Sequence, residues 1–187
     1  MATSSQGVTE QVRVWNIDPA HTQVEFGVRH LMLSTVKGRF PGVAGTVRLD
    51  QDDPSRSSVK VEIDASSIDT RNADRDAHLR SGDFFDVENH PTIRFESREV
   101  EISDDRYRVG GELTIRGVSR PVVLRVERLG EVVDPWGYER IGFHAETRIN
   151  RKDFGLTWNQ LLEAGGVTVG EEVQISLDIQ AVAGEEA

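Results

Sequence analysis

The histidines are the residues of this sequence best suited to acid–base or metal chemistry, because the chain contains no cysteine. The missing cysteine excludes thiolate nucleophiles, disulfide bonds, iron–sulfur clusters and cysteine-ligated zinc. A metal site would need several histidines or carboxylates at the spacing of metal ligands. The histidines lack that spacing, so we predict no metal site. The histidines of the chain are His21, His30, His78, His90 and His144.

His78 ends the run Arg75-Asp76-Ala77-His78, which resembles a histidine base oriented by an acid. Side chains two positions apart on a helix do not face each other. We therefore favour a structural role for this run over catalysis, and contact with a ligand head group is the third interpretation. The common hydrolase, nucleotide-binding and zinc-protease signatures are absent. An enzyme that uses His78 or His30 as a general base stays as an alternative hypothesis.

Acidic residues dominate the charge of the chain, with 32 Asp plus Glu against 22 Lys plus Arg and a formal net charge of -10. Such a chain repels phosphate backbones and anionic membranes on average, so we expect no nucleic-acid partner. No run approaches the roughly 18 apolar residues of a membrane span, and residues 1–11 hold neither the basic segment nor the apolar run of a signal peptide. We expect a soluble, cytoplasmic protein without stable membrane insertion.

The length of 187 residues fits one domain, whose bounds we place at residues 12–183. Residues 1–11 and 184–187 are expected to be flexible tails. Apolar and polar residues alternate along most of the domain, which is typical of half-buried antiparallel strands. In residues 59–65, for example, Val61 and Ile63 should face a core.

Similar alternation elsewhere predicts about eight antiparallel strands in an all-β domain. Strands with one apolar face must close into a barrel or pair as a sandwich, and periodicity alone does not choose between these architectures. A closed sheet of about eight strands can fill with side chains or hold one small ligand.

Two segments break the alternation. Residues 69–81 predict a short helix with Asp69 or Thr70 as its N-cap, and residues 30–37 predict a further turn of helix. His30 shares its parity with apolar neighbours, so it should point inward, either as a hydrogen-bonded core histidine or toward a ligand. The aromatic residues at 84–85 and 154–158 could line a pocket mouth or plug a barrel end.

A long central motif makes the chain similar to the YceI-like family of polyisoprenoid-binding proteins. The motif runs from Arg75 to Asp86 as RDAHLRSGDFFD and continues as PTIRFES from Pro91. The upstream WNIDPAHT and the segment 30–40 resemble the opening of that family, and GELTIRGV and NRKDFG resemble its later strands. The resemblance covers residues 12–183.

The resemblance implies a lipocalin-like closed antiparallel barrel whose elongated pore holds a long isoprenoid or a similar amphiphilic lipid. It also implies homodimers and no catalytic apparatus, and family members often carry a signal peptide and work in the periplasm. The expected ligand is a polyisoprenoid, a quinone or a prenyl pyrophosphate, which the protein would sequester or carry, with no separate cofactor. The remaining alternative is a filled barrel that acts as a structural or interaction protein.

Strand parity assigns the side chains expected to line this pore. Those on the apolar faces are Phe26, Phe40, Val61, Ile63, Phe95, Ile115, Phe143, Trp158, Ile175 and Leu177. Three polar residues are expected to contact the head group of the ligand, namely His30, Arg75 and His78.

Overall fold

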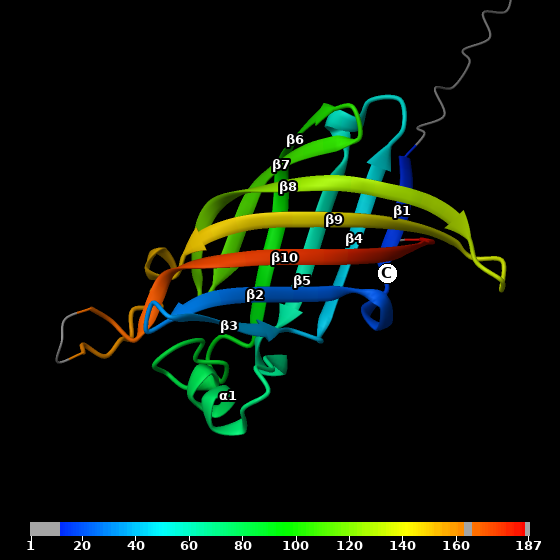
Figure 1. Ribbon diagram of the computed structural model, residues 1–187. Coiled ribbons are helices and arrows are strands. Elements are labelled where there is room, and N and C mark those ends of the chain that lie inside the picture. The colour runs from blue at the N-terminus through cyan, green and yellow to red at the C-terminus, as the bar shows by residue number, and fades with distance from the viewer. Residues whose placement is uncertain (1–11, 163–165, 186–187) are drawn as a thin grey trace, which may run out of the picture.

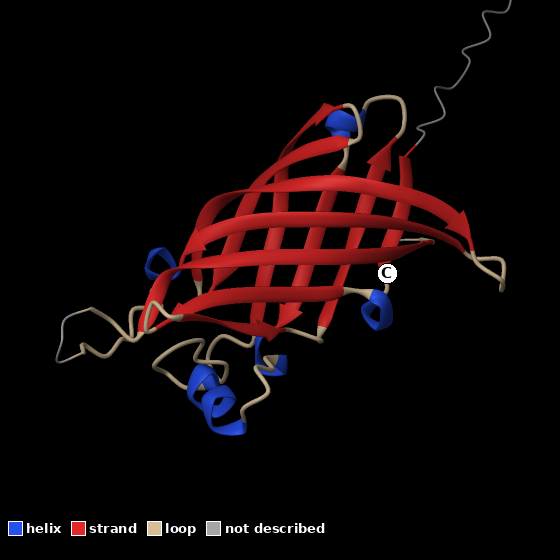
Figure 2. Ribbon diagram, viewed as in Figure 1, coloured by secondary structure: helices blue, strands red, loops and turns tan. Residues whose placement is uncertain are grey.

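The computed structural model describes residues 12–162 and 166–185, which form a strongly curved antiparallel sheet (Figure 1). Its strands are β1 Val12–Ile17, β2 Gln23–His30, β3 Ser34–Arg39, β4 Val43–Asp50, β5 Ser58–Asp64, β6 Thr92–Ser103, β7 Arg106–Ile115, β8 Val118–Val133, β9 Glu139–Asn150 and β10 Val169–Ala183. The helix is α1, Ala73–Arg80, and short 3₁₀ turns are η1 Pro19–His21, η2 Pro54–Arg56, η3 Ala65–Ser67 and η4 Arg151–Phe154. The helical segments lie at the edges of the sheet (Figure 2).

Eight of the described strands close into a barrel. The hydrogen-bonded order is β1-β4-β5-β6-β7-β8-β9-β10, and β10 pairs back onto β1, with Trp15 opposite Ala183. This confirms the predicted closed antiparallel barrel of eight strands. Closure removes the exposed sheet edges that an open sheet of this size would leave.

The two other strands form a hairpin on the same edge of β10. β1 pairs with the end of β10 at residues 181–183, and β2 pairs with its earlier part, residues 169–178. β3 then pairs with β2. The chain therefore leaves the barrel ring after β1, passes through η1, and extends the wall of the barrel beyond the ring.

Period-2 alternation places the apolar side chains inside, as the sequence predicts for β5. Val61 is buried and Ile63 is half-buried, whereas Lys60 and Glu62 are exposed. Tight turns join neighbouring strands, as between β7 and β8, where Arg116 and Gly117 both have positive φ.

The helix differs from the predicted one at its start. α1 begins at Ala73, and Asn72 is its N-cap, with a side-chain oxygen that accepts a hydrogen bond from the Arg75 N–H. Asp69 instead accepts a hydrogen bond from the Arg71 N–H in the preceding turn. Several Asx residues compete for the cap in this segment, and sequence alone does not rank them.

The predicted turn of helix at residues 30–37 is wrong. The chain reverses at Leu31 and Met32, which both have positive φ, and Ser34–Arg39 forms the strand β3. Pairing with β2 satisfies the backbone of this segment, so the long-range ladder replaces the local helix.

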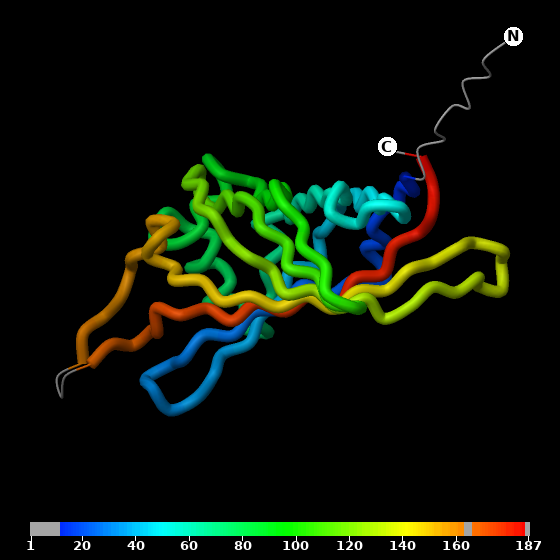
Figure 3. Tube along the Cα trace, turned by 90° about the horizontal axis from the view of Figure 1, so that it is seen from above, coloured from blue at the N-terminus to red at the C-terminus, as the bar shows by residue number. Residues whose placement is uncertain are grey.

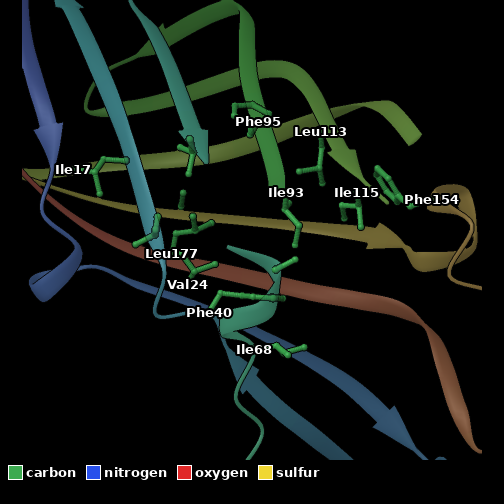
Figure 4. Packing of buried hydrophobic residues seen from close by; sticks show 14 of the residues in the cluster. Ile17, Val24, Phe40, Ile68, Ile93, Phe95, Leu113, Ile115, Phe154 and Leu177 are labelled. Atoms are coloured by element: carbon green, nitrogen blue, oxygen red, sulfur yellow. The ribbon is translucent and has the colours of Figure 1, made fainter. Parts of the chain in front are cut away.

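The packed core occupies the barrel interior. In the close-up of Figure 4, buried apolar side chains from strands and from the segments between them face the interior, among them Val24, Phe40, Phe95 and Leu177. A second buried cluster packs where β1 closes on β10, and it consists of Trp15, Val47, Ile141, Phe143 and Ala181.

The C-terminal end of the described chain is hydrogen-bonded to β1. The Gly184 N–H donates to the Val14 carbonyl, and the Asn16 amide donates to the Glu185 carbonyl. The remaining residues of the expected tails, 1–11 and 186–187, lie outside the described residues. The bounds of 12–183 for the domain stay a prediction.

Candidate ligand-binding site

A cavity of about 410 Å³ lies inside the barrel, among the strands of its walls. Its volume falls within the range of about 300 to 1,000 Å³ found for small-molecule sites. Apolar side chains dominate the lining. All residues that strand parity assigned to the pore line this cavity: Phe26, Phe40, Val61, Ile63, Phe95, Ile115, Phe143, Trp158, Ile175 and Leu177.

The sheet register explains why these side chains face one another. Val61 on β5 lies opposite Phe95 on β6, and Ile175 on β10 lies opposite Phe26 on β2. Directly paired residues of an antiparallel ladder project from the same face. Two sections of wall therefore present matched apolar pairs to the cavity.

Two glycines make room for aromatic rings of the lining. A Cβ atom at Gly38 would lie 2.3 Å from Cζ of Phe26, and one at Gly111 would lie 2.7 Å from Cζ of Phe95. Either contact is far shorter than carbon atoms tolerate. Glycine at these two positions therefore leaves the space that the rings of Phe26 and Phe95 occupy.

Aromatic residues from four segments meet at the side of the cavity covered by α1. Phe40 packs on Phe26 and on Phe85, with ring centroids 5.5 and 5.7 Å apart. The rings of Phe84 and Trp158 lie 5.4 Å apart. These rings line the cavity and pack against each other.

His78 lies between two of these rings. Its imidazole meets Trp158 edge-on at 4.7 Å and Phe84 at 5.1 Å, measured between ring centroids. Its Nε2 atom is 2.8 Å from Oδ2 of Asp83. Asp83, beyond the end of α1, is thus the acid paired with His78, in place of the Asp76 of the sequence motif.

Arg75 and Asp76 share Thr70 as a partner. The Arg75 guanidinium donates to Oγ1 and to the carbonyl oxygen of Thr70, at 2.8 and 2.7 Å. The buried Asp76 carboxylate accepts hydrogen bonds from the Thr70 N–H and hydroxyl. This network fixes the start of α1 against the barrel and holds Arg75 at the cavity wall.

His30 and His144 occupy different environments. His30 is half-buried at the end of β2 and lines the cavity, as its parity predicts. His144 lies outside the cavity, where its ring nitrogens meet Glu146 and Asp178 at 3.0 and 2.7 Å. Hydrogen bonds to Glu146 and then Asp178 raise the pKa of His144 above its ordinary value. His144 therefore has a surface role.

The described residues hold no group of three or more His, Asp or Glu side chains arranged to bind a metal ion. No helix in that part of the chain is long and apolar enough to span a membrane. The chemistry offered by the cavity is apolar burial with a few polar groups in the lining.

Comparison with known proteins agrees with this geometry. The model of the YceI-like domain matches residues 15–181. The chain belongs to the YceI-like family. A UPF0312 protein of Pseudomonas paraeruginosa is 39% identical over 162 residues, which is 87% of this chain and 82% of that protein.

Solved YceI-like structures share the barrel. The crystal structure of the Campylobacter jejuni YceI protein has a TM-score of 0.71 and 29% identity, and the match covers 84% of this chain and 90% of the other. A polyisoprenoid-binding domain of Saccharophagus degradans has a TM-score of 0.67 and 16% identity, with 91% and 98% covered. At that identity, the second likeness concerns the fold alone.

Arg151 is a cavity-lining residue of this YceI-like chain that strand parity does not single out. It is 3% exposed, and its guanidinium donates to the carbonyls of Gly170, Leu156, Trp158 and Val169. Burial lowers the pKa of Arg151, and the nearby Glu171 acts in the opposite direction. The motif NRKDFG contains this arginine, and its resemblance to the family is the feature of the sequence that could have identified the residue. The apolar–polar alternation ends at Asn150, so it does not predict whether the next side chain points inward or outward.

Proposed function

We propose that this YceI-like protein binds a long-chain isoprenoid or a similar amphiphilic lipid in the barrel cavity and carries or sequesters it without chemical change. The single observation that carries the proposal is the apolar lining of the cavity, which extends through the barrel from Leu49 and Val59 to His30 and Val169. The polyisoprenoid-binding domain of Saccharophagus degradans has the same fold, which supports the choice of ligand class.

The energetics favour a long apolar ligand. Each buried CH₂ group contributes about 0.8 kcal/mol, so several five-carbon units offset the cost of ordering a flexible chain. A head group needs only one or two polar contacts. His30, Arg75 and His78 all line the cavity and are the residues we propose for that contact.

The polar groups favour binding over catalysis. Asp83 pairs with the His78 ring, and aromatic rings pack on two of its sides. Arg75 is held by Thr70. These contacts hold the side chains in place. Among the described residues, the hydrogen-bond partner of the His78 ring is Asp83, and the Ser81 hydroxyl donates to the His78 backbone carbonyl rather than to the ring, so no hydroxyl is paired with the imidazole as a nucleophile would be.

Organic extraction of the purified protein followed by mass spectrometry tests the proposal. We expect a co-purified isoprenoid alcohol, quinone or prenyl phosphate in near-stoichiometric amount. The extracted protein should regain thermal stability when a prenol is added back, because a ligand that binds only the folded state stabilises it.

Two results would overturn the proposal. One is an extract without lipid from a protein whose melting temperature does not respond to prenols of any chain length, as expected for a filled structural barrel. The other is chemical conversion of the added lipid by the wild-type protein that His78→Gln abolishes. The homodimer implied by the family resemblance stays a prediction, which sedimentation velocity would check.

A further inference from the structure

Exposed apolar side chains surround the end of the cavity where the β2–β3 hairpin lies. Met32 is 62% exposed at the hairpin turn, Leu33 beside it is 81% exposed, and Leu161 in the segment between η4 and β10 is 81% exposed. We call these three residues the rim. Figures 1 and 3 show the hairpin and the segment before β10 at one end of the molecule, with the β8–β9 hairpin at the opposite end.

The rim is connected to the cavity through the backbone. The Leu31 N–H donates to the Thr168 carbonyl at 2.8 Å, and His30 pairs with Val169 across β2 and β10. His30, Thr168 and Val169 all line the cavity. Leu161 pairs with Val167, next to Thr168. The rim residues therefore lie next to lining residues on both segments.

The hairpin turn holds its apolar residues in a strained backbone. Leu31 and Met32 have φ values of 52° and 56°, in the left-handed region that costs a side chain about 1 to 2 kcal/mol per residue. The Leu33 N–H donates to the His30 carbonyl and closes a turn whose two central residues both have positive φ, which is a position that normally uses Asn-Gly. Strain kept at the bulky, solvent-exposed Met32 points to a role outside folding.

The charge around the rim is unlike that of the whole chain. Residues 26–49 contain no Asp or Glu, although the net charge of the protein is -10. Arg29 and Lys37 are exposed on the outward face of the hairpin, and the Arg29 guanidinium donates to the Met32 carbonyl at 2.9 Å. Apolar tips with basic residues beside them are the composition of elements that insert into anionic membrane surfaces.

The β8–β9 hairpin lacks that combination. Trp136 is 78% exposed at its tip, yet this hairpin also carries Glu131, Asp134 and Glu139, which form ion pairs with arginines. It offers no excess positive charge to an anionic surface. The β8–β9 hairpin exposes more large apolar side chains than the β2–β3 hairpin, namely Leu129, Val132, Val133, Trp136 and Tyr138. Charge, not apolar exposure, therefore distinguishes the β2–β3 hairpin.

We propose that the rim docks on the surface of a lipid bilayer that contains anionic phospholipid, so that a lipid passes between the bilayer and the cavity without crossing water. This inference rests on the proposed lipid-binding function. Met32, Leu33 and Leu161 enter the interface, while Arg29 and Lys37 lie at the level of the phosphates. The contact is peripheral and reversible, because three side chains bury little area.

Vesicle co-sedimentation of the full chain tests the docking. The probes are phosphatidylcholine vesicles with and without a minor fraction of phosphatidylglycerol. We expect wild-type protein to bind the vesicles with phosphatidylglycerol, and added salt to weaken the binding. The double variant Met32→Ser/Leu33→Ser should bind about tenfold or more weakly, and Lys37→Gln about fivefold more weakly. The matched control Trp136→Ser, at the opposite hairpin, should bind like wild type.

A second variant separates docking from folding. Leu31→Asn/Met32→Gly supplies the residues that the turn prefers, so it should raise the melting temperature and still weaken vesicle binding. A variant that gains stability and keeps full vesicle binding would contradict a role for the rim.

The experiments can refute the docking proposal and the lipid-binding proposal separately. Rim variants should keep the wild-type rise in melting temperature with a short prenol, because they leave the cavity lining intact. Wild type that gains stability from the prenol but binds neither vesicle type overturns the docking proposal alone. Loss of vesicle binding in Trp136→Ser, with none in the rim variants, also overturns it. Absence of the prenol effect in wild type counts against the proposed function instead.

Discussion

Filling the cavity at Val61 should abolish lipid binding. Val61 is 6% exposed on β5, faces the cavity, and lies opposite Phe95. The substitution Val61→Trp places an indole in the space beside that pair. If the indole displaces one isoprene unit, five carbons at about 0.8 kcal/mol each remove about 4 kcal/mol of binding free energy, or about a thousandfold in Kd.

The assay is the rise in melting temperature caused by a prenol. At a concentration of about 100 Kd the ligand stabilises wild type by about 2.7 kcal/mol, which corresponds to a rise of about 5 to 11 °C for a chain of this length. A thousandfold weaker Kd leaves about 0.1 kcal/mol at the same concentration, so the variant should show a rise below about 1 °C. Overpacking can lower the stability of the unliganded variant by about 1 to 3 kcal/mol.

Glu62→Trp is the matched control, since it puts the same side chain on the outer face of the same strand. It loses only an exposed ion pair with Arg94, at 3.4 Å, which contributes little to stability. It should keep the wild-type response. A folded Val61→Trp protein with the full response would refute the cavity as the binding site, and loss of the response in Glu62→Trp alone would place binding on the outer surface.

Three further predictions concern stability and are checked by urea unfolding. Arg151→Met should lower the free energy of unfolding by about 3 to 5 kcal/mol, because buried carbonyls lose their donors; a cost below 1 kcal/mol would contradict that role. Asp76→Ala should cost about 2 to 4 kcal/mol through its lost bonds to Thr70, whereas Asp74→Ala, on the exposed face of α1, is the control. The pKa of His144 is raised in the folded state, so protonated His144 stabilises the protein below pH 6.5 and this contribution disappears as pH rises through the raised pKa. His144→Gln should therefore lower stability more at about pH 6 than at about pH 8.5, and an equal loss at both would exclude the ionic contribution.

Local patterns predicted the walls of the cavity but not all of its polar groups. Alternation placed Val61, Phe95 and Ile175 on the inner face because the side-chain period of a strand is a property of a few consecutive residues. Arg151 follows the end of β9 in a 3₁₀ turn, where no period applies, and its carbonyl partners lie later in the chain, from Leu156 to Gly170. Asp83 likewise reaches His78 only because the chain turns back after α1.

The sequence by itself determined the all-β class, the inward and outward faces of the strands, and the family. Only the tertiary structure decided that the sheet closes, because closure depends on Trp15 pairing with Ala183 at the other end of the chain, and no local period encodes that contact. The same long-range pairing turned residues 34–39 into a strand where the local pattern suggested helix. It also brought the β2–β3 hairpin beside the segment before β10, which is why the cavity and the exposed rim lie together.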